Sequence, residues 1–163
     1  MGRVASLALG VAILLGATPA AAHHYDVVAV DKTTMAAADR DSVVREGFKA
    51  YAWFSFYFPD EDADPIVKQL TEFDCGRGRI RAINQTYYRA DGRRLASIDF
   101  VGEWAQARPG DRVEAMLLYA CKGPKNAKRI AWDDRELYAQ YKQQVEQGFR
   151  VFEFADPARV RSR

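Results

Sequence analysis

Hydrophobic and polar residues alternate over much of residues 25–101, a pattern typical of β-strands with one buried face. The longest run spans residues 48–58, where both the even and the odd positions carry aromatic side chains. A strand that is aromatic on both faces is expected at the centre of a sheet, covered on each side. Shorter β-prone runs at residues 25–30 and 42–45 predict further strands before it.

A first hairpin is predicted after this strand. A two-residue turn at Gly76–Arg77 aligns opposite charges and apolar residues in a single register. The pairs that this register predicts are Asp74 with Arg79, Glu72 with Arg81, Phe73 with Ile80, and Thr71 with Ala82.

A second hairpin follows, because Asp91–Gly92 is a strong signal for a tight turn. The predicted pairs are Tyr88 with Leu95 and Thr86 with Ser97. Alternation along the strands then places Tyr87 and Ile98 on the face opposite Phe73.

Two helices are predicted towards the C-terminus. Asp111 can cap the backbone N–H of Glu114, and Gly123–Pro124 ends this first helix. Its apolar residues form one stripe that must lie on the sheet: Val113, Met116, Leu117, Ala120 and Cys121. The second helix opens at residues 132–134, ends near Gly148, and is expected to cover the other sheet face with Leu137, Tyr138, Tyr141 and Val145. A short strand at residues 149–154 and a basic tail complete the chain.

Residues 1–22 have the features of a secretory signal, with a basic start, an apolar run and an Ala-x-Ala cleavage site. We expect an exported mature chain from His23, with a domain over residues 23–123 and a helical extension with a basic tail over residues 124–163. The apolar run is shorter than the ~20 residues of a membrane-spanning helix, so the mature chain is predicted to have no integral span. The formal net charge of +2 gives no argument for nucleic acid binding.

Cys75 and Cys121 are the only cysteines in the chain. Both lie on faces predicted to point inward, and exported proteins meet oxidising surroundings, so a disulfide is the simplest interpretation. Such a bond would stabilise the fold by ~4 kcal/mol. The alternatives are a buried pair of free thiols or a metal site, and the lack of a nearby histidine disfavours the metal.

Residues suited to catalysis are scarce. The only histidines, His23 and His24, are the first two residues of the expected mature chain, and no serine lies in a strand-to-helix elbow. We therefore predict no enzymatic activity and no cofactor. The histidine pair beside a free amine is a candidate for copper handling, and an ordinary chain terminus is the favoured alternative.

Two sets of residues are candidates for ligand binding. Arg77, Arg93 and Arg94 lie on the hairpin turns and suit an acidic polysaccharide or an acidic protein segment, although solvated turn charges are the alternative. Tyr51, Trp53 and Tyr57 form an aromatic row typical of interfaces, or else the floor beneath the C-terminal helix.

Several of these motifs resemble the surface-adhesin protein E domain over roughly residues 25–122. They are Glu72-Phe73-Asp74-Cys75, Arg79-Ile80-Arg81, Tyr87-Tyr88, Trp104, Arg108-Pro109-Gly110 and Leu117-Leu118-Tyr119-Ala120-Cys121. The resemblance implies an antiparallel sheet with a helix, a Cys75–Cys121 bridge, an outer-surface role in binding host matrix proteins, and a homodimer.

Together these features predict an α+β fold, with a mostly antiparallel sheet of about five to six strands, one disulfide-joined helix and a further C-terminal helix. The predicted function is that of an exported, non-catalytic binding module of the bacterial envelope, in the periplasm or on the outer cell surface. The alternative is a periplasmic structural or assembly partner without a host ligand.

Overall fold

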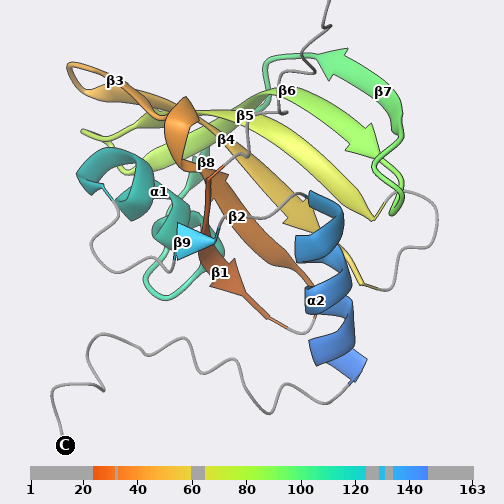
Figure 1. Ribbon diagram of the computed structural model, residues 1–163. Helices are drawn as coiled ribbons and strands as arrows, with labels where there is room; N and C mark the ends of the chain where they lie inside the picture. The colour runs from red at the N-terminus through yellow and green to blue at the C-terminus, as the bar shows by residue number, and fades with distance from the viewer. Residues whose placement is uncertain (1–23, 32, 60–64, 124–128, 131–133, 147–163) are drawn as a thin grey trace, which may run out of the picture.

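The computed structural model of the chain describes residues 24–31, 33–59, 65–123, 129–130 and 134–146. These residues form a curled antiparallel sheet with helices packed against it (Figure 1). The predicted signal at residues 1–22 and the predicted strand at residues 149–154 lie outside the described residues.

In chain order the elements are β1 (Tyr25–Val30), β2 (Met35–Asp39), a 3₁₀ turn (Arg40–Ser42), β3 (Val44–Glu46), β4 (Lys49–Tyr57), β5 (Ile66–Asp74), β6 (Arg79–Tyr88), β7 (Arg94–Asp99), β8 (Ala105–Gln106), α1 (Arg112–Lys122), β9 (Arg129–Ile130) and α2 (Asp134–Glu146). The sheet order is β7-β6-β5-β4-β2-β1-β9, with β3 added to β4 and β8 added to β6. The α+β class is confirmed. The described sheet has nine strands, more than predicted, because short strands such as β8 and β9 are too brief to show a periodicity.

Strand β4 is central, as predicted. It pairs with β5 along its whole length and with β2 and β3 on its other side. Its alanine and phenylalanine face lies beneath α1, whereas Tyr57 on its opposite face is fully buried against α2. One detail was wrong: Phe48 precedes the strand and is 81% exposed, because the β3–β4 turn carries it out of the sheet.

The first core lies between α1 and the sheet. Asp111 caps the helix as predicted, since its carboxylate accepts a hydrogen bond from the Glu114 N–H at 2.7 Å. The predicted apolar stripe faces the sheet, with Met116 and Ala120 buried. Small side chains on β2 and β4 let the helix approach closely; the buried members are Ala36, Ala38, Ala50, Ala52, Phe54, Phe56, Phe73, Ile80, Met116, Tyr119 and Ala120.

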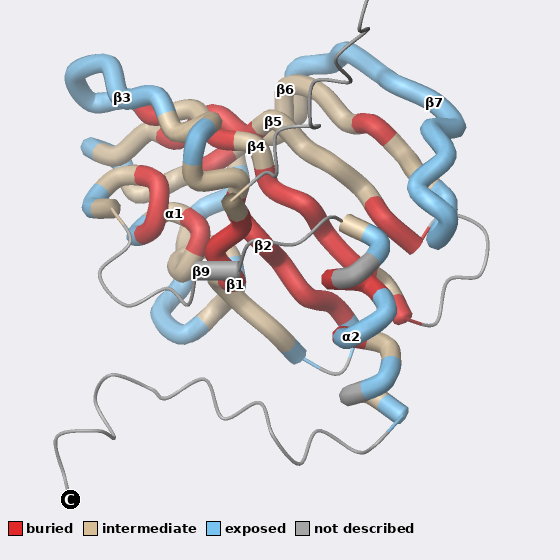
Figure 2. The backbone as a smooth tube through the Cα atoms, in the orientation of Figure 1, coloured by how far each residue is buried: buried red, intermediate tan, exposed pale blue. Residues whose placement is uncertain are grey.

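The second core lies on the other face of the sheet, beneath α2, as predicted (Figure 2). Its buried members are Tyr25, Val27, Met35, Ala37, Tyr57, Ile66, Leu137, Tyr138 and Tyr141. The first residue of α2 fastens the helix to the sheet: Asp134 accepts a hydrogen bond from the Tyr57 hydroxyl at 2.9 Å and pairs with Lys68 at 2.5 Å. Burial and the neighbouring Asp134 charge raise the pKa of Tyr57 well above its usual value.

The register of the first hairpin is confirmed from Asp74 with Arg79 through Thr71 with Ala82. Beyond this point Leu70 pairs with Asn84, so Ile83 is the extra residue of a β-bulge. The bulge exchanges the two faces of the following residues. The prediction for Tyr87 and Ile98 was therefore wrong, and both lie on the same face as Phe73.

The second hairpin also departs from its predicted register near the turn. Thr86 pairs with Ser97 as predicted, but a second irregularity pairs Tyr88 with Arg94 and not with Leu95. Tyr88 packs against the second core because the bulge at Ile83 places it opposite Ile66.

The disulfide between Cys75 and Cys121 is confirmed, with a Cα–Cα distance of 5.7 Å and a sequence separation of 46. It joins the β5–β6 turn to the last turn of α1. Among the described helices, none has the length and apolar character needed to cross a membrane.

Candidate functional site

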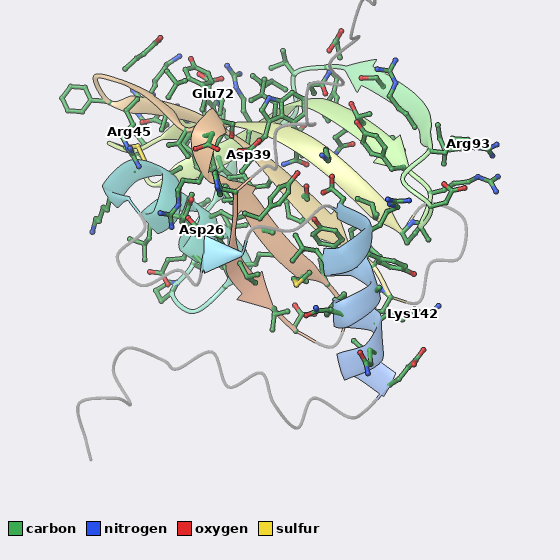
Figure 3. All side chains as sticks on the ribbon, in the orientation of Figure 1. Asp26, Asp39, Arg45, Glu72, Arg93 and Lys142 are labelled. Atoms are coloured by element: carbon green, nitrogen blue, oxygen red, sulfur yellow. A yellow bond between two sulfur atoms is a disulfide. The ribbon has the colours of Figure 1, made fainter. Side chains whose placement is uncertain are left out.

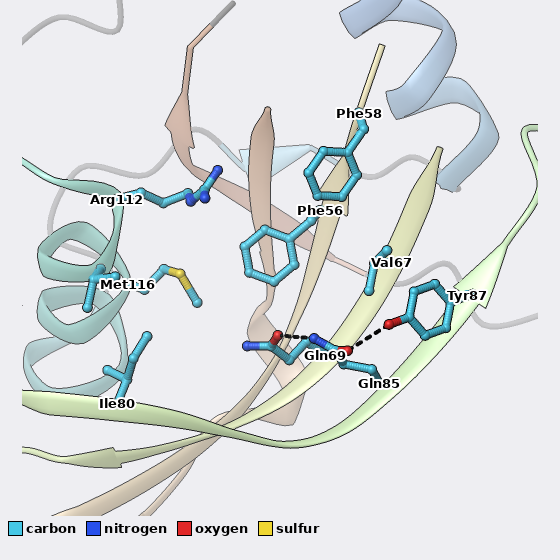
Figure 4. Close-up of a pocket in the computed structure, with 10 residues that line it drawn as sticks. Phe56, Phe58, Val67, Gln69, Ile80, Gln85, Tyr87, Arg112 and Met116 are labelled. Carbon is cyan, nitrogen blue, oxygen red and sulfur yellow. Dashed lines mark hydrogen bonds between the residues drawn. The ribbon is translucent and has the colours of Figure 1, made fainter. Parts of the chain in front are cut away.

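A groove opens between α1 and the sheet, next to the area that the helix covers (Figure 4). Its volume is about 420 Å³. The residues that line it are Phe56, Phe58, Val67, Gln69, Ile80, Gln85, Tyr87, Arg112, Val113 and Met116. We refer to it as the α1 groove.

The floor of the α1 groove is a polar ladder across the strands. The Tyr87 hydroxyl donates to Gln85 Oε1 at 2.8 Å, and Gln85 Nε2 donates to Gln69 Oε1 at 2.8 Å. Gln69 Nε2 in turn donates to the hydroxyl of the buried Thr71 at 2.9 Å. Because each member orients the next, the amides are held in fixed positions.

The ladder leaves hydrogen-bonding capacity for a ligand. A glutamine amide has two N–H groups and a carbonyl oxygen with two lone pairs. The ladder takes one N–H from Gln69 and one from Gln85, so each amide has a second donor to offer. Flanking Phe56 and Val67 supply apolar contact on the same floor.

Among the described residues, one charged side chain, Arg112, lines the groove. Arg112, at the first position of α1, is exposed, and its guanidinium carbon lies 5.7 Å from the centre of the Phe56 ring. Burial alone would raise the pKa of Asp31, but hydrogen bonds from Thr33 and Thr34 and the Arg112 charge lower it. The carboxylates of Asp111 and Glu114 already accept hydrogen bonds from N–H groups at the N-terminus of α1. The cation that the lining offers to a ligand carboxylate is therefore Arg112.

The chemistry of the lining fits binding. Its side chains are hydrocarbon, amide, phenol and guanidinium groups, and the residues described there include no carboxylate, imidazole or thiol. Hydrophobic walls with a few placed polar groups are typical of ligand pockets.

The structure does not bring the three candidate arginines together. Arg77 lies on the β5–β6 turn, whereas Arg93 and Arg94 belong to the β6–β7 turn, and the length of β6 separates them by roughly 30 Å. All three are exposed. Arg79 pairs with Asp74 at 3.0 Å, and Arg81 pairs with Glu72 at 2.6 Å, as the predicted hairpin register required.

Arg93 and Arg94 acquire a neighbour that the sequence did not suggest. The side chain of Arg135, from the first turn of α2, packs over Gly92 at the tip of the same turn. Arg89 is exposed beside them. A local basic turn thus remains as a candidate anion site, and its binding role stays a prediction.

The aromatic row is divided between two environments. Tyr57 lies under α2, which leaves Tyr51 and Trp53 half-buried and outside the helix. The Tyr51 hydroxyl donates to Glu72 at 3.4 Å. A ligand-binding role therefore rests on Tyr51 and Trp53 alone.

Of the two histidines, His23 lies outside the described residues. His24 Nδ1 lies 3.1 Å from a carboxylate oxygen of Asp41. The described part of the chain contains no group of three or more histidine, cysteine or carboxylate side chains placed to hold a metal ion.

Gln69, Gln85 and Arg112 were missed in the sequence. The bulge at Ile83 hid the two glutamines, because the predicted register did not pair them. Arg112 looked like an ordinary first-turn helix residue. No signal in the sequence marked the bulge that brings Gln69 and Gln85 together.

The described residues thus form a small α+β domain in which a disulfide ties α1 to the sheet and a groove opens beside that helix. The family model for surface-adhesin protein E matches residues 25–122, and the chain belongs to that family. The crystal structure of protein E from non-typeable Haemophilus influenzae is similar at 11% identity, covering 78% of this chain and 92% of that one with a TM-score of 0.46. No curated protein matches the chain.

Proposed function

We propose that this protein is an exported, non-catalytic binding module of the bacterial envelope that holds a segment of a protein ligand in the α1 groove. The observation that carries the proposal is the polar ladder of Gln69 and Gln85 on the floor of an otherwise apolar groove. Membership of the surface-adhesin protein E family supports the adhesive class. The family also supports export and a host matrix protein as the ligand.

The groove selects the chemistry of that segment. Amide donors and acceptors on the floor suit an extended backbone, which offers carbonyl and N–H groups in a row. Apolar walls suit side chains such as leucine or phenylalanine. Arg112 at the mouth suits an acidic residue or a C-terminal carboxylate.

A binding assay with purified extracellular-matrix glycoproteins tests the proposal. The mature chain is passed over each immobilised glycoprotein and compared with the Arg112→Gln variant and with Arg108→Gln, an exposed arginine in the loop before α1. Arg112→Gln should weaken binding about tenfold, because a charge-assisted contact is lost. Equal binding by both variants, or no binding by the unmodified chain, would contradict the proposal.

A second candidate ligand is an acidic polysaccharide at the basic β6–β7 turn. Packing of Arg135 over Gly92 next to Arg93 and Arg94 favours it. The double variant Arg93→Gln, Arg94→Gln should elute earlier from heparin and with a weaker salt dependence, whereas Arg77→Gln should elute unchanged. Unchanged elution of the double variant would exclude this site.

The alternative role is a periplasmic assembly partner without a host ligand. Protease or antibody treatment of intact cells separates the two, because only a surface protein is reached. Homodimer formation remains a prediction from the family resemblance, and light scattering of the purified mature chain checks it.

A further inference from the structure

The tip of the β3–β4 hairpin presents one large apolar side chain to solvent. Glu46 pairs with Lys49 across a two-residue turn formed by Gly47 and Phe48. Gly47 has a φ of +59°, which suits the first central position of such a turn. Phe48 is 81% exposed, and the hairpin projects past the end of α1 (Figures 1 and 2).

Several separate segments converge beside this tip. The Phe48 carbonyl accepts a hydrogen bond from the Cys75 N–H at 2.8 Å, which places the β5–β6 turn next to it. Arg45 on β3 donates to the Ala120 carbonyl at 2.6 Å, which places the end of α1 there as well (Figure 3). The Cys75–Cys121 disulfide joins those two segments covalently.

The convergence surrounds Phe48 with positive charge. Basic side chains come from each segment: Arg45, Lys49, Arg77 and Lys122, all exposed. Glu46 is the exposed acidic residue of the hairpin. The nearby carboxylates of Glu72 and Asp74 are largely buried: Glu72 pairs with Lys49 and Arg81, and Asp74 pairs with Arg79 and, at 3.9 Å, with Arg77. With Arg79 and Arg81 included, six basic side chains face the three carboxylates of Glu46, Glu72 and Asp74, so the charge around the tip is net positive.

We propose that this end of the molecule docks on the surface of a bilayer that contains anionic phospholipid. The Phe48 ring enters the boundary between headgroups and acyl chains, and the basic rim contacts headgroup phosphates. Charge complementarity supplies the argument for the occupant. A single ring on a convex projection finds apolar contact in a fluid surface, whereas protein hot spots usually fill pockets in well-packed interfaces.

The proposal does not depend on which ligand binds in the α1 groove. It does predict how the groove is oriented relative to the lipid surface. The rim includes the C-terminal end of α1, while Arg112 at the groove mouth marks its N-terminal end. The helix has 11 residues, so these ends are separated by roughly 16 Å along the helix axis. A chain docked through Phe48 would hold the groove mouth away from the lipid.

Co-sedimentation with vesicles tests the proposal. The mature chain is mixed with phosphatidylcholine vesicles that contain either no or about 30 mol% phosphatidylglycerol. Binding is expected only to the anionic vesicles and should weaken with added salt. Phe48→Ser should lower the partition coefficient about tenfold, whereas Val101→Ser, which changes a residue that is 70% exposed, should leave it unchanged.

Two further variants sharpen the result. The double variant Arg77→Gln, Lys122→Gln should also lower the partition coefficient for anionic vesicles about tenfold. The double variant Arg93→Gln, Arg94→Gln should leave that coefficient unchanged. Phe48→Trp should bind anionic vesicles as well as the unmodified chain does. The fluorescence emission of the new tryptophan should shift to shorter wavelength on contact with the vesicles. Equal sedimentation with neutral and anionic vesicles, an equal loss in Val101→Ser, or retention on heparin without vesicle binding would overturn the proposal.

Discussion

Gln85 donates a hydrogen bond to Gln69 across β6 and β5 at 2.8 Å, and this contact depends on the bulge at Ile83. In a regular ladder Gln69 would lie opposite Asn84, and Gln85 would face the second core. The bulge moves Gln85 to the α1 side and continues with Val67 opposite Tyr87. One extra residue in β6 thus sets the polarity of the groove floor.

The first prediction concerns this ladder. Gln85→Leu removes the acceptor of Tyr87 and the donor to Gln69. Because the groove is open to water, the stability loss should be only ~1 kcal/mol, while binding of a glycoprotein ligand should fall by about tenfold. Urea unfolding and the binding assay measure the two effects, with exposed Gln143→Leu on α2 as the control. A large stability loss with unchanged binding would mean that the ladder only holds the fold together.

Much of the fold was predictable because its signals are local. The Asp111 cap, the helix stripe through Met116 and the charge register around Glu72 each depend on residues close in sequence. The bulge at Ile83 is different, because it is a feature of the pairing between β5 and β6 that no local turn or periodicity signal marks. The alternation of polar and apolar residues therefore could not predict which face of the sheet the residues after Ile83 lie on. For the same reason it could not predict the α1 groove.

The candidate site was less predictable than the fold. Exposed arginines and aromatic residues are visible in any sequence, but their proximity is not. The structure separates Arg77 from Arg93 and buries Tyr57, while it brings Arg112 to the glutamine ladder. Which side chains from different strands and helices lie close together is determined by the topology of the fold.

The second prediction concerns the disulfide. Cys75→Ser, Cys121→Ser opens a loop with a sequence separation of 46, and the unfolded chain then gains entropy worth ~4 kcal/mol. Urea unfolding should show this loss in the variant and an equal loss in the unmodified chain under reducing conditions. A difference below about 1 kcal/mol would show that packing of α1 suffices without the bond.

The third prediction concerns a buried carboxylate. Asp26 is fully buried and accepts hydrogen bonds from Arg40 at 2.6 and 2.7 Å and from the Tyr119 hydroxyl at 2.6 Å. Burial and the Asp26 charge raise the pKa of Tyr119. Asp26→Asn leaves the Arg40 charge without its partner and should cost ~3 kcal/mol. Tyr119→Phe should cost ~1 kcal/mol; an equal cost for both in thermal or urea unfolding would contradict this ranking.

The last prediction concerns pH and Glu72. Burial alone would raise the pKa of Glu72, but the hydrogen bonds from Lys49 at 2.7 Å and Arg81 at 2.6 Å lower it from its usual value of 4.5. Since the folded state holds the proton less tightly than the unfolded state, these pairs stabilise the fold above the usual pKa. That stabilisation is lost as the pH falls through the lowered pKa.

Glu72→Gln should therefore be less stable than the unmodified chain by ~1–2 kcal/mol at neutral pH. The difference should shrink in acid, because the carboxylate of the unmodified chain is then protonated too. Urea unfolding of both proteins at several pH values from neutral to about pH 3 measures it, with exposed Glu46→Gln as a control that changes little at any pH. A difference of constant size across this range would show that the Glu72 side chain contributes through packing and not through its charge.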